Sequence, residues 1–147
     1  MRTVSPFRRV LVGFDGSPDA AAALGAGTAI AVGDGGHVVA LCVLPSAMHE
    51  EGHEQDGGGV RKQAEDFLAE LARVQRADKP VRMSVQVVYS DRGSAADVVT
   101  DYAEQHGFDI LVLGRHGDGA HRKSRLGRVT DRAAQACSVP VLVVSAR

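Results

Sequence analysis

Residues 109–144 read DILVLGRHGDGAHRKSRLGRVTDRAAQACSVPVLVV. Within this stretch, apolar runs predict a buried strand at residues 110–113 and a second apolar strand at residues 139–144. A glycine-rich loop over residues 114–127 and a helical segment over about residues 129–137 lie between them. Open α/β sheets bind anions where a strand leads into a helix, because backbone N–H groups and the helix N-terminus point there. The loop is therefore the first candidate binding site.

This loop is rich in glycine and in positive charge. Glycine lets the backbone approach a ligand closely and adopt a positive φ without a Cβ clash. Between Gly114 and Arg128, Asp118 is the only acidic residue. The basic residues in this range are Arg115, Arg122, Lys123, Arg125 and Arg128. Because the whole chain has a formal net charge of -1, this local concentration of cations suits a polyphosphate. A surface loop with solvated charges is the alternative interpretation.

The spacing of the glycines is specific. The loop contains neither the P-loop pattern GxxxxGK[ST] nor the GxGxxG dinucleotide fingerprint. It contains G-x2-G-x9-G, formed by Gly114, Gly117 and Gly127. Related segments are VLVGFDGS at 10–17, LCV at 41–43, DILVLGRHG at 109–117 and VPVLVV at 139–144. On these motifs together the chain resembles the universal stress protein family, as a UspA-like domain, over nearly its full length.

The other apolar runs predict alternating strands and helices. Strands are expected at residues 8–14, 37–44 and 81–89, and helices at 18–32, 60–77 and from a Ser94 cap to Gly107. This alternation predicts a single α/β domain over residues 1–147, an open parallel five-stranded sheet with helices on both faces. The resemblance adds the Rossmann-like strand order 3-2-1-4-5. In that order the glycine loop meets the end of the first strand at the switch point between strands 1 and 4.

The resemblance also implies a site for ATP, with or without Mg²⁺. Asp15, at the tip of the first strand, is the candidate contact to the ribose or base, and the main chain of Val43 is the candidate contact to adenine. The implied phosphate side comprises Gly114, Arg115, Gly117, Gly127, Arg128, Val129 and Thr130. From the residues alone, Asp15 is equally typical of a turn in which its carboxylate accepts local N–H groups.

Arg128 departs from the family pattern, which places Ser or Thr after the third glycine. Its guanidinium either contacts the phosphates or fills their site, and Thr130 offers a hydroxyl nearby. The first alternative predicts an ATP-binding regulator or stress-survival factor. The sequence shows no dedicated catalytic apparatus for it, so at most weak ATP hydrolysis is expected. The second alternative predicts a nucleotide-free dimeric interaction protein of the same fold.

Composition and the last apolar run bear on location and partners. A net charge of -1 argues against non-specific nucleic-acid binding. No apolar run approaches the length of a membrane span, and the N-terminus lacks a signal-peptide pattern, so a cytoplasmic protein is expected. An apolar edge strand at residues 139–144 needs cover. A homodimer through this strand is therefore expected, as the resemblance also implies.

Two further features carry weaker signals. HEEGH at residues 49–53 has the letters of the HExxH zinc motif. Gly52 inside it disfavours the helix that would place both histidines on one face, so we expect a solvated loop and no metal site. Cys42 and Cys137 are expected to be two buried, reduced thiols.

Overall fold

The computed structural model describes residues 7–31, 35–46, 59–74, 81–91, 94–116 and 127–146. Its strands are β1 (Arg9–Gly13), β2 (His37–Leu44), β3 (Arg82–Tyr89), β4 (Ile110–Gly114) and β5 (Val141–Val144). Its helices are α1 (Pro18–Ala31), α3 (Val60–Val74), α4 (Ala95–Gln105) and α5 (Arg128–Ala136). These elements confirm the predicted alternation of strands and helices.

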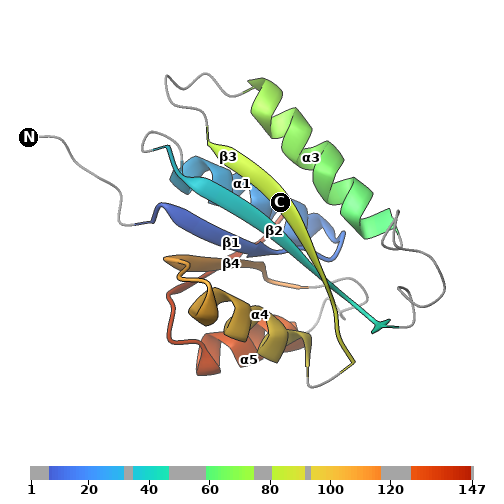
Figure 1. The fold of residues 1–147 in the computed structure, drawn as a ribbon, viewed down its shortest axis with the longest axis vertical. Coiled ribbons are helices and arrows are strands. Elements are labelled where there is room, and N and C mark those ends of the chain that lie inside the picture. Colours follow the sequence, from blue (N-terminus) through green and yellow to red (C-terminus); the bar gives the residue numbers. More distant parts are fainter. Residues whose placement is uncertain are drawn as a thin grey trace, which may run out of the picture.

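The five strands form one parallel sheet in the order β3-β2-β1-β4-β5 (Figure 1), which confirms the predicted order. β1 lies in the middle, with β2 and β4 as its neighbours. Because the strands are parallel, their carboxyl ends share one edge of the sheet. The switch point at that edge lies between β1 and β4, where the loops after these two strands lead to opposite faces.

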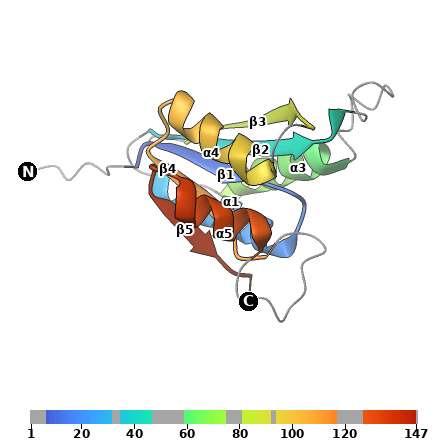
Figure 2. The same ribbon diagram turned by 90° about the horizontal axis from the view of Figure 1, so that it is seen from below.

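Helices cover both faces of the sheet. α1 and α3 pack on one face, and α4 and α5 lie together on the other (Figures 1 and 2). The α1 and α3 side of the core contains Val10, Val12, Leu24, Cys42 and Leu68, whereas the α4 and α5 side contains Leu11, Leu41, Val99, Leu111 and Ala133. Successive residues of a strand point to opposite faces, so the nearly continuous apolar runs of β1, β2 and β4 supply both cores.

Small residues bring α1 close to the sheet. A Cβ on Gly27 would stand 2.9 Å from Val12 Cγ2 and 3.1 Å from Val10 Cγ1, so only glycine allows this approach without a shift of the neighbours. Alanines at neighbouring positions are buried in the same contact, including Ala20, Ala23 and Ala31. The close packing of α1 on β1 therefore fixes the N-terminus of α1 relative to the sheet edge.

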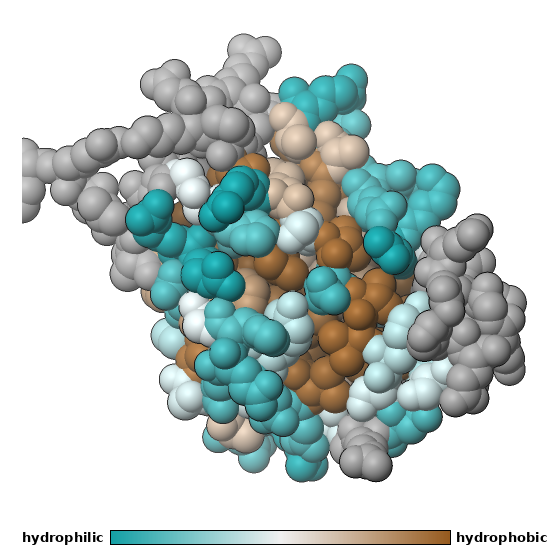
Figure 3. Space-filling view, in the orientation of Figure 1, coloured by the Kyte–Doolittle hydropathy of each residue, from teal (hydrophilic) through white to brown (hydrophobic). Residues whose placement is uncertain are grey.

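β3 is an edge strand of the sheet. Its exposure alternates between exposed and half-buried residues along Arg82–Gln86. Apolar side chains show in the middle of the face drawn in Figure 3, where β2 and β3 extend beyond α4. The helix before β4 begins as predicted, because Ser94 and Asp97 form a reciprocal capping box at the start of α4.

Two predictions need correction. The last strand begins at Val141 rather than at residue 139. Pro140 has no N–H to donate to a neighbouring strand, although its carbonyl accepts a hydrogen bond from Leu111 N at 2.9 Å. Cys137 is half-buried at the C-terminal cap of α5, whereas Cys42 is buried as predicted, and both thiols are free. The predicted end of the 60–77 helix lies outside the described residues.

Candidate functional site

The first part of the site is the edge formed by the ends of β1 and β2. Gly13 pairs with Leu41, and Phe14 N donates to Leu41 O at 2.9 Å, which extends this pairing by one residue. Asp15 and Val43 each follow that pair by two residues. The register therefore brings these two predicted contact residues to neighbouring positions at the sheet edge.

Asp15 forms the local turn that was one of its two interpretations. Its Oδ1 accepts the N–H of Ser17 at 2.9 Å, and Gly16 between them has a φ of 86°. Ser17 then caps α1, since its Oγ accepts the N–H of Ala20 at 3.1 Å. Asp15 is exposed at this edge. A carboxylate has several acceptor sites, so the turn is compatible with a contact to a ligand.

The described residues at the two ends of the glycine loop lie close together. Arg115, the first residue after β4, donates its N–H to Val144 O at 2.8 Å, and its carbonyl accepts the N–H of Gly127 at 2.7 Å. The two ends of the loop are thus hydrogen-bonded to each other and to the end of β5. Gly117 and the rest of residues 117–126 lie outside the described part of the chain.

Close packing against α1 requires a glycine at position 114, the last residue of β4. A Cβ at this position would stand 2.7 Å from the carbonyl carbon of Asp19 and 2.8 Å from the N of Ala20. Both are backbone atoms in the first turn of α1, so they cannot move aside as a flexible side chain would. The root of the loop therefore lies directly against the N-terminus of α1.

The N-terminus of α5 has the properties of an anion site. Gly127 is its N-cap, in an extended conformation and without a side-chain capping bond. The first backbone bond of the helix runs from Asp131 N to Gly127 O. The N–H groups of Arg128, Val129 and Thr130 therefore have no acceptor within the helix, and the helix dipole adds positive potential there.

The side chains of these three residues differ in position. Arg128 is exposed and Val129 is half-buried. Thr130 is only 4% exposed, and its hydroxyl donates to Gly114 O at 2.6 Å. That hydroxyl hydrogen is committed to the protein, so in this arrangement Thr130 positions α5 against β4 and does not donate to a phosphate.

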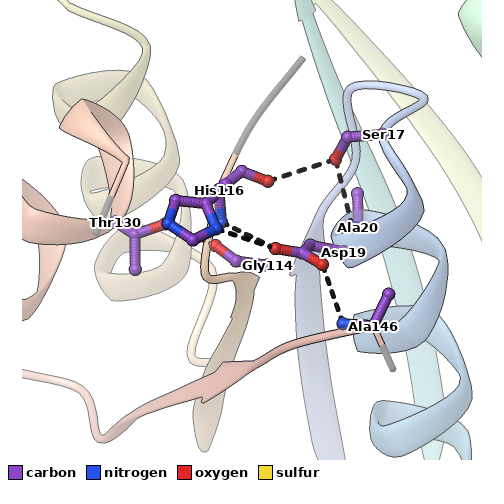
Figure 4. Close-up of polar contacts among 7 residues, drawn as sticks. All are labelled: Ser17, Asp19, Ala20, Gly114, His116, Thr130 and Ala146. Carbon is purple, nitrogen blue, oxygen red and sulfur yellow. Dashed lines mark hydrogen bonds and ion pairs between the residues drawn. The ribbon is translucent and has the colours of Figure 1, made fainter. Parts of the chain in front are cut away.

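Asp19 is a residue of this region that sequence reasoning missed. Its Oδ2 accepts the N–H of His116 at 3.0 Å and lies 3.4 Å from Nδ1 of the same residue, and its Oδ1 accepts the N–H of Ala146 at 2.7 Å (Figure 4). The Ala146 amide contributes most to lowering the pKa of Asp19, with a smaller contribution from His116. An acid in a first helical turn is ordinary, so only the fold identifies this one.

Within the described ranges, no group of three or more His, Cys, Asp and Glu side chains is arranged to hold a metal ion. The HEEGH segment at residues 49–53 lies outside those ranges. In the part of the chain with assigned structure, no helix has both the length and the apolar character to cross a bilayer.

Comparison with known proteins decides the family. The family model described as "Universal stress protein family" matches residues 6–145. The chain belongs to the universal stress protein family. This confirms the resemblance that the glycine spacing and the strand motifs indicated.

Solved structures share the fold of this universal stress protein. The structure of hypothetical protein MJ0577 has a TM-score of 0.78 at 23% identity and is covered over 99% of its length by 98% of this chain. UspA from Lactobacillus plantarum has a TM-score of 0.70 at 21% identity, with 94% of this chain and 97% of that chain covered. The universal stress protein from Archaeoglobus fulgidus in complex with dAMP has a TM-score of 0.69 at 15% identity, with 94% and 98% covered.

Two further family structures with this fold carry adenine nucleotides. One universal stress protein was solved in complex with cAMP, at 20% identity to this chain. A family protein from Arabidopsis thaliana was solved with AMP bound, at 15% identity. Adenine nucleotide binding therefore occurs on this fold within the family.

Proposed function

We propose that this universal stress protein binds an adenine nucleotide, specifically ATP with or without Mg²⁺, at the carboxyl edge of its sheet, and acts as a cytoplasmic regulator or stress-survival factor. The observation that carries the proposal is the convergence at one edge of Asp15, the root of the glycine loop and the N-terminus of α5, whose N-cap Gly127 makes no side-chain capping bond. The family structures with dAMP, cAMP and AMP support the same ligand class.

In this proposal the two ends of the nucleotide bind to different elements. The adenosine end lies at β1 and β2, where Asp15 accepts from the ribose or base and the main chain of Val43 pairs with adenine. The phosphates lie at the glycine loop and at the first N–H groups of α5, where the dipole and the absence of a capping side chain favour an anion. Arg115 and Arg128 add positive charge on this side.

The exposed position of Arg128 favours this proposal over the nucleotide-free alternative. A guanidinium that filled the phosphate site would be enclosed by it, whereas Arg128 is exposed at the start of α5. We therefore assign Arg128 to charge–charge contact with the phosphates. Arg128→Ser is expected to weaken ATP binding, and tighter binding by this variant would favour the alternative in which Arg128 blocks the site.

The first test is to denature the freshly purified protein and to chromatograph the released small molecules. ATP or ADP near one equivalent per chain supports the proposal. If none is released, calorimetry with Mg-ATP and with ATP plus EDTA tests the empty protein. The absence of both released nucleotide and binding heat would move the assignment to a nucleotide-free interaction protein.

Separate variants test the adenosine end and the phosphate end of the proposed site. Asp15→Asn keeps one oxygen to accept from Ser17 N but removes the charge, so it should weaken adenosine and ATP binding by similar factors. Gly127→Val and Gly117→Val should abolish ATP binding while circular dichroism stays unchanged. Gly25→Ala in α1 is the control, because a Cβ there meets nothing within 4 Å. Unchanged ATP affinity in a folded Gly127→Val protein would remove the loop from the site.

We also propose that the protein is a homodimer through β5. Among the described residues, Leu142 and Val143 are the large apolar side chains that are exposed, each to 36%, and they lie side by side on an edge strand. Pairing of this strand with its copy would satisfy the free edge and cover the side chains.

A further inference from the structure

Asp19 joins chain segments that are far apart in sequence. One carboxylate oxygen accepts from His116, at the root of the glycine loop, and the other accepts from Ala146, just after β5 (Figure 4). These partners lie 97 and 127 residues from Asp19 along the chain. The side chain is 15% exposed, so most of its surroundings are protein, and hydrogen bonds to a charged acceptor are strong in such an environment.

Further contacts lie beside Asp19, where the glycine loop begins. Ser17 Oγ lies 3.4 Å from the carbonyl oxygen of His116, which is a long and weak hydrogen bond. Gly114 packs its backbone against the first turn of α1 with no space for a Cβ. The adjacent amide of Arg115 is bonded to the end of β5. The first turn of α1, the loop root and the end of β5 thus form one connected cluster.

We propose that Asp19 is a positioning residue of the nucleotide site: it holds the backbone of Arg115 and His116 where the chain leaves β4, and so fixes the backbone from which Arg115 reaches the phosphates. This inference rests on the proposed function. Asp19 itself is a carboxylate and repels phosphate, so its effect on affinity acts through His116. A binding group whose backbone is already held in place loses less conformational entropy when the ligand binds.

The variant Asp19→Asn tests this role with little change in size. Asparagine has one acceptor oxygen where aspartate has two, so it cannot serve both amides, and its NH₂ group faces one of them. Because the lost contact is a hydrogen bond to a charged group, the affinity for ATP should fall about ten-fold or more. Adenosine, which has no phosphates, should keep its affinity. Asp19→Glu retains two acceptors and should recover part of the ATP affinity.

Glu104→Gln is the matched control. Glu104 also accepts a backbone N–H with a carboxylate, from Ser138 at 2.9 Å, but it does so at the end of α4 away from the loop. It should leave the affinities for ATP and adenosine unchanged. An equal loss of both affinities in Asp19→Asn, or no loss of ATP affinity, would overturn the inference.

A second readout needs no ligand. Amide hydrogen exchange followed by NMR should speed up at His116, at Ala146 or at both in Asp19→Asn, and should stay unchanged at both amides in Glu104→Gln, where the amide oxygen can still accept from Ser138. If the unmodified protein binds no nucleotide, the proposed function fails. The positioning role is then judged by exchange, and unchanged protection of both amides in Asp19→Asn would overturn it.

Discussion

The hydroxyl of Thr130 donates to the carbonyl oxygen of Gly114 across 2.6 Å, and so joins the first turn of α5 to the last residue of β4. The two residues are 16 positions apart and stand at opposite ends of the glycine loop. Together with the bond from Gly127 N to Arg115 O, this contact returns the chain to the point from which the loop departs. The position of the α5 N-terminus therefore depends on a buried side-chain bond.

Replacement of Thr130 by valine should destabilise the fold. Valine has the same shape but leaves the Gly114 carbonyl without this donor, which should lower the free energy of unfolding by about 1–2 kcal/mol. Thr28→Val is the control, because the Thr28 hydroxyl bonds to Leu24 O, a carbonyl that also receives a helical N–H. Urea denaturation of both variants checks the difference, and equal losses would contradict it.

Gly114→Ala should be destabilising by overpacking. The added Cβ would meet backbone atoms of Asp19 and Ala20 at 2.7 and 2.8 Å, and a clash of this kind costs about 1–3 kcal/mol. Gly25→Ala should instead stabilise the protein by about 0.5–1 kcal/mol, since the helix has open space there. Thermal unfolding should therefore shift in opposite directions for the two variants.

The contribution of Asp19 to stability should depend on pH with a defined sign. The pKa of Asp19 is lowered from its ordinary value of 3.8, chiefly by the Ala146 amide. A carboxylate with a lowered folded-state pKa contributes stability above its unfolded-state pKa, and this stability is lost as the pH falls through the folded-state pKa. Asp19→Asn should therefore cost about 1–2 kcal/mol near neutral pH and progressively less below about pH 4.

The pH dependence of the Asp19→Asn effect must be measured in a protein that lacks the imidazole of His116. His116 Nδ1 lies 3.4 Å from Asp19 Oδ2, so the two side chains interact directly. The unfolding free energies of His116→Gln and of Asp19→Asn in that background, compared from neutral to acid pH, isolate the carboxylate. A cost that stays constant down to the acid limit would show that charge on Asp19 is irrelevant.

The two cysteines should differ in reactivity. Cys42 is fully buried, and burial raises the pKa of its thiol to about 12. At about pH 8 almost none of it is thiolate, and the thiolate is the reactive form. A disulfide reagent should therefore modify Cys137 in the native protein and Cys42 only after addition of denaturant. Rapid reaction in a native Cys137→Ser protein would contradict this.

Leu142→Asp should disrupt self-association. A charge on the exposed edge strand opposes pairing with a second copy, and light scattering after size exclusion would show a monomer. Gln86→Asp places the same charge on the exposed edge strand at the other side of the sheet, and its mass should equal that of the unmodified protein. A monomeric unmodified protein would remove the dimer from the proposal.

Local patterns in the sequence predicted most of the fold. The bounds of the second strand, His37–Leu44, match the prediction because its apolar run ends at Pro45. The capping box at Ser94 is a contact over three residues, so it is visible in sequence. The last strand was predicted two residues too long, because its apolar pattern includes Pro140 and does not show that this residue cannot donate to the sheet.

The candidate site was likewise predicted only in part from the sequence. Glycine spacing and residue type predicted the loop, Asp15 and the start of α5. They did not predict Asp19, because its amide partners are 97 and 127 residues away and amides carry no side-chain signature. They also left the function of the Thr130 hydroxyl open, since its acceptor is a backbone carbonyl in another element.

The sequence by itself determined the alternation of strands and helices, the glycine loop and the family to which the chain belongs. These follow from periodicity, from turn chemistry and from spacings within short segments. Only the tertiary structure decided which carboxylate the root of the loop and the end of β5 share, and which hydroxyl joins α5 to β4. Such bonds depend on where the sheet register and the packing of α1 place distant backbone groups, and every residue carries the same backbone groups.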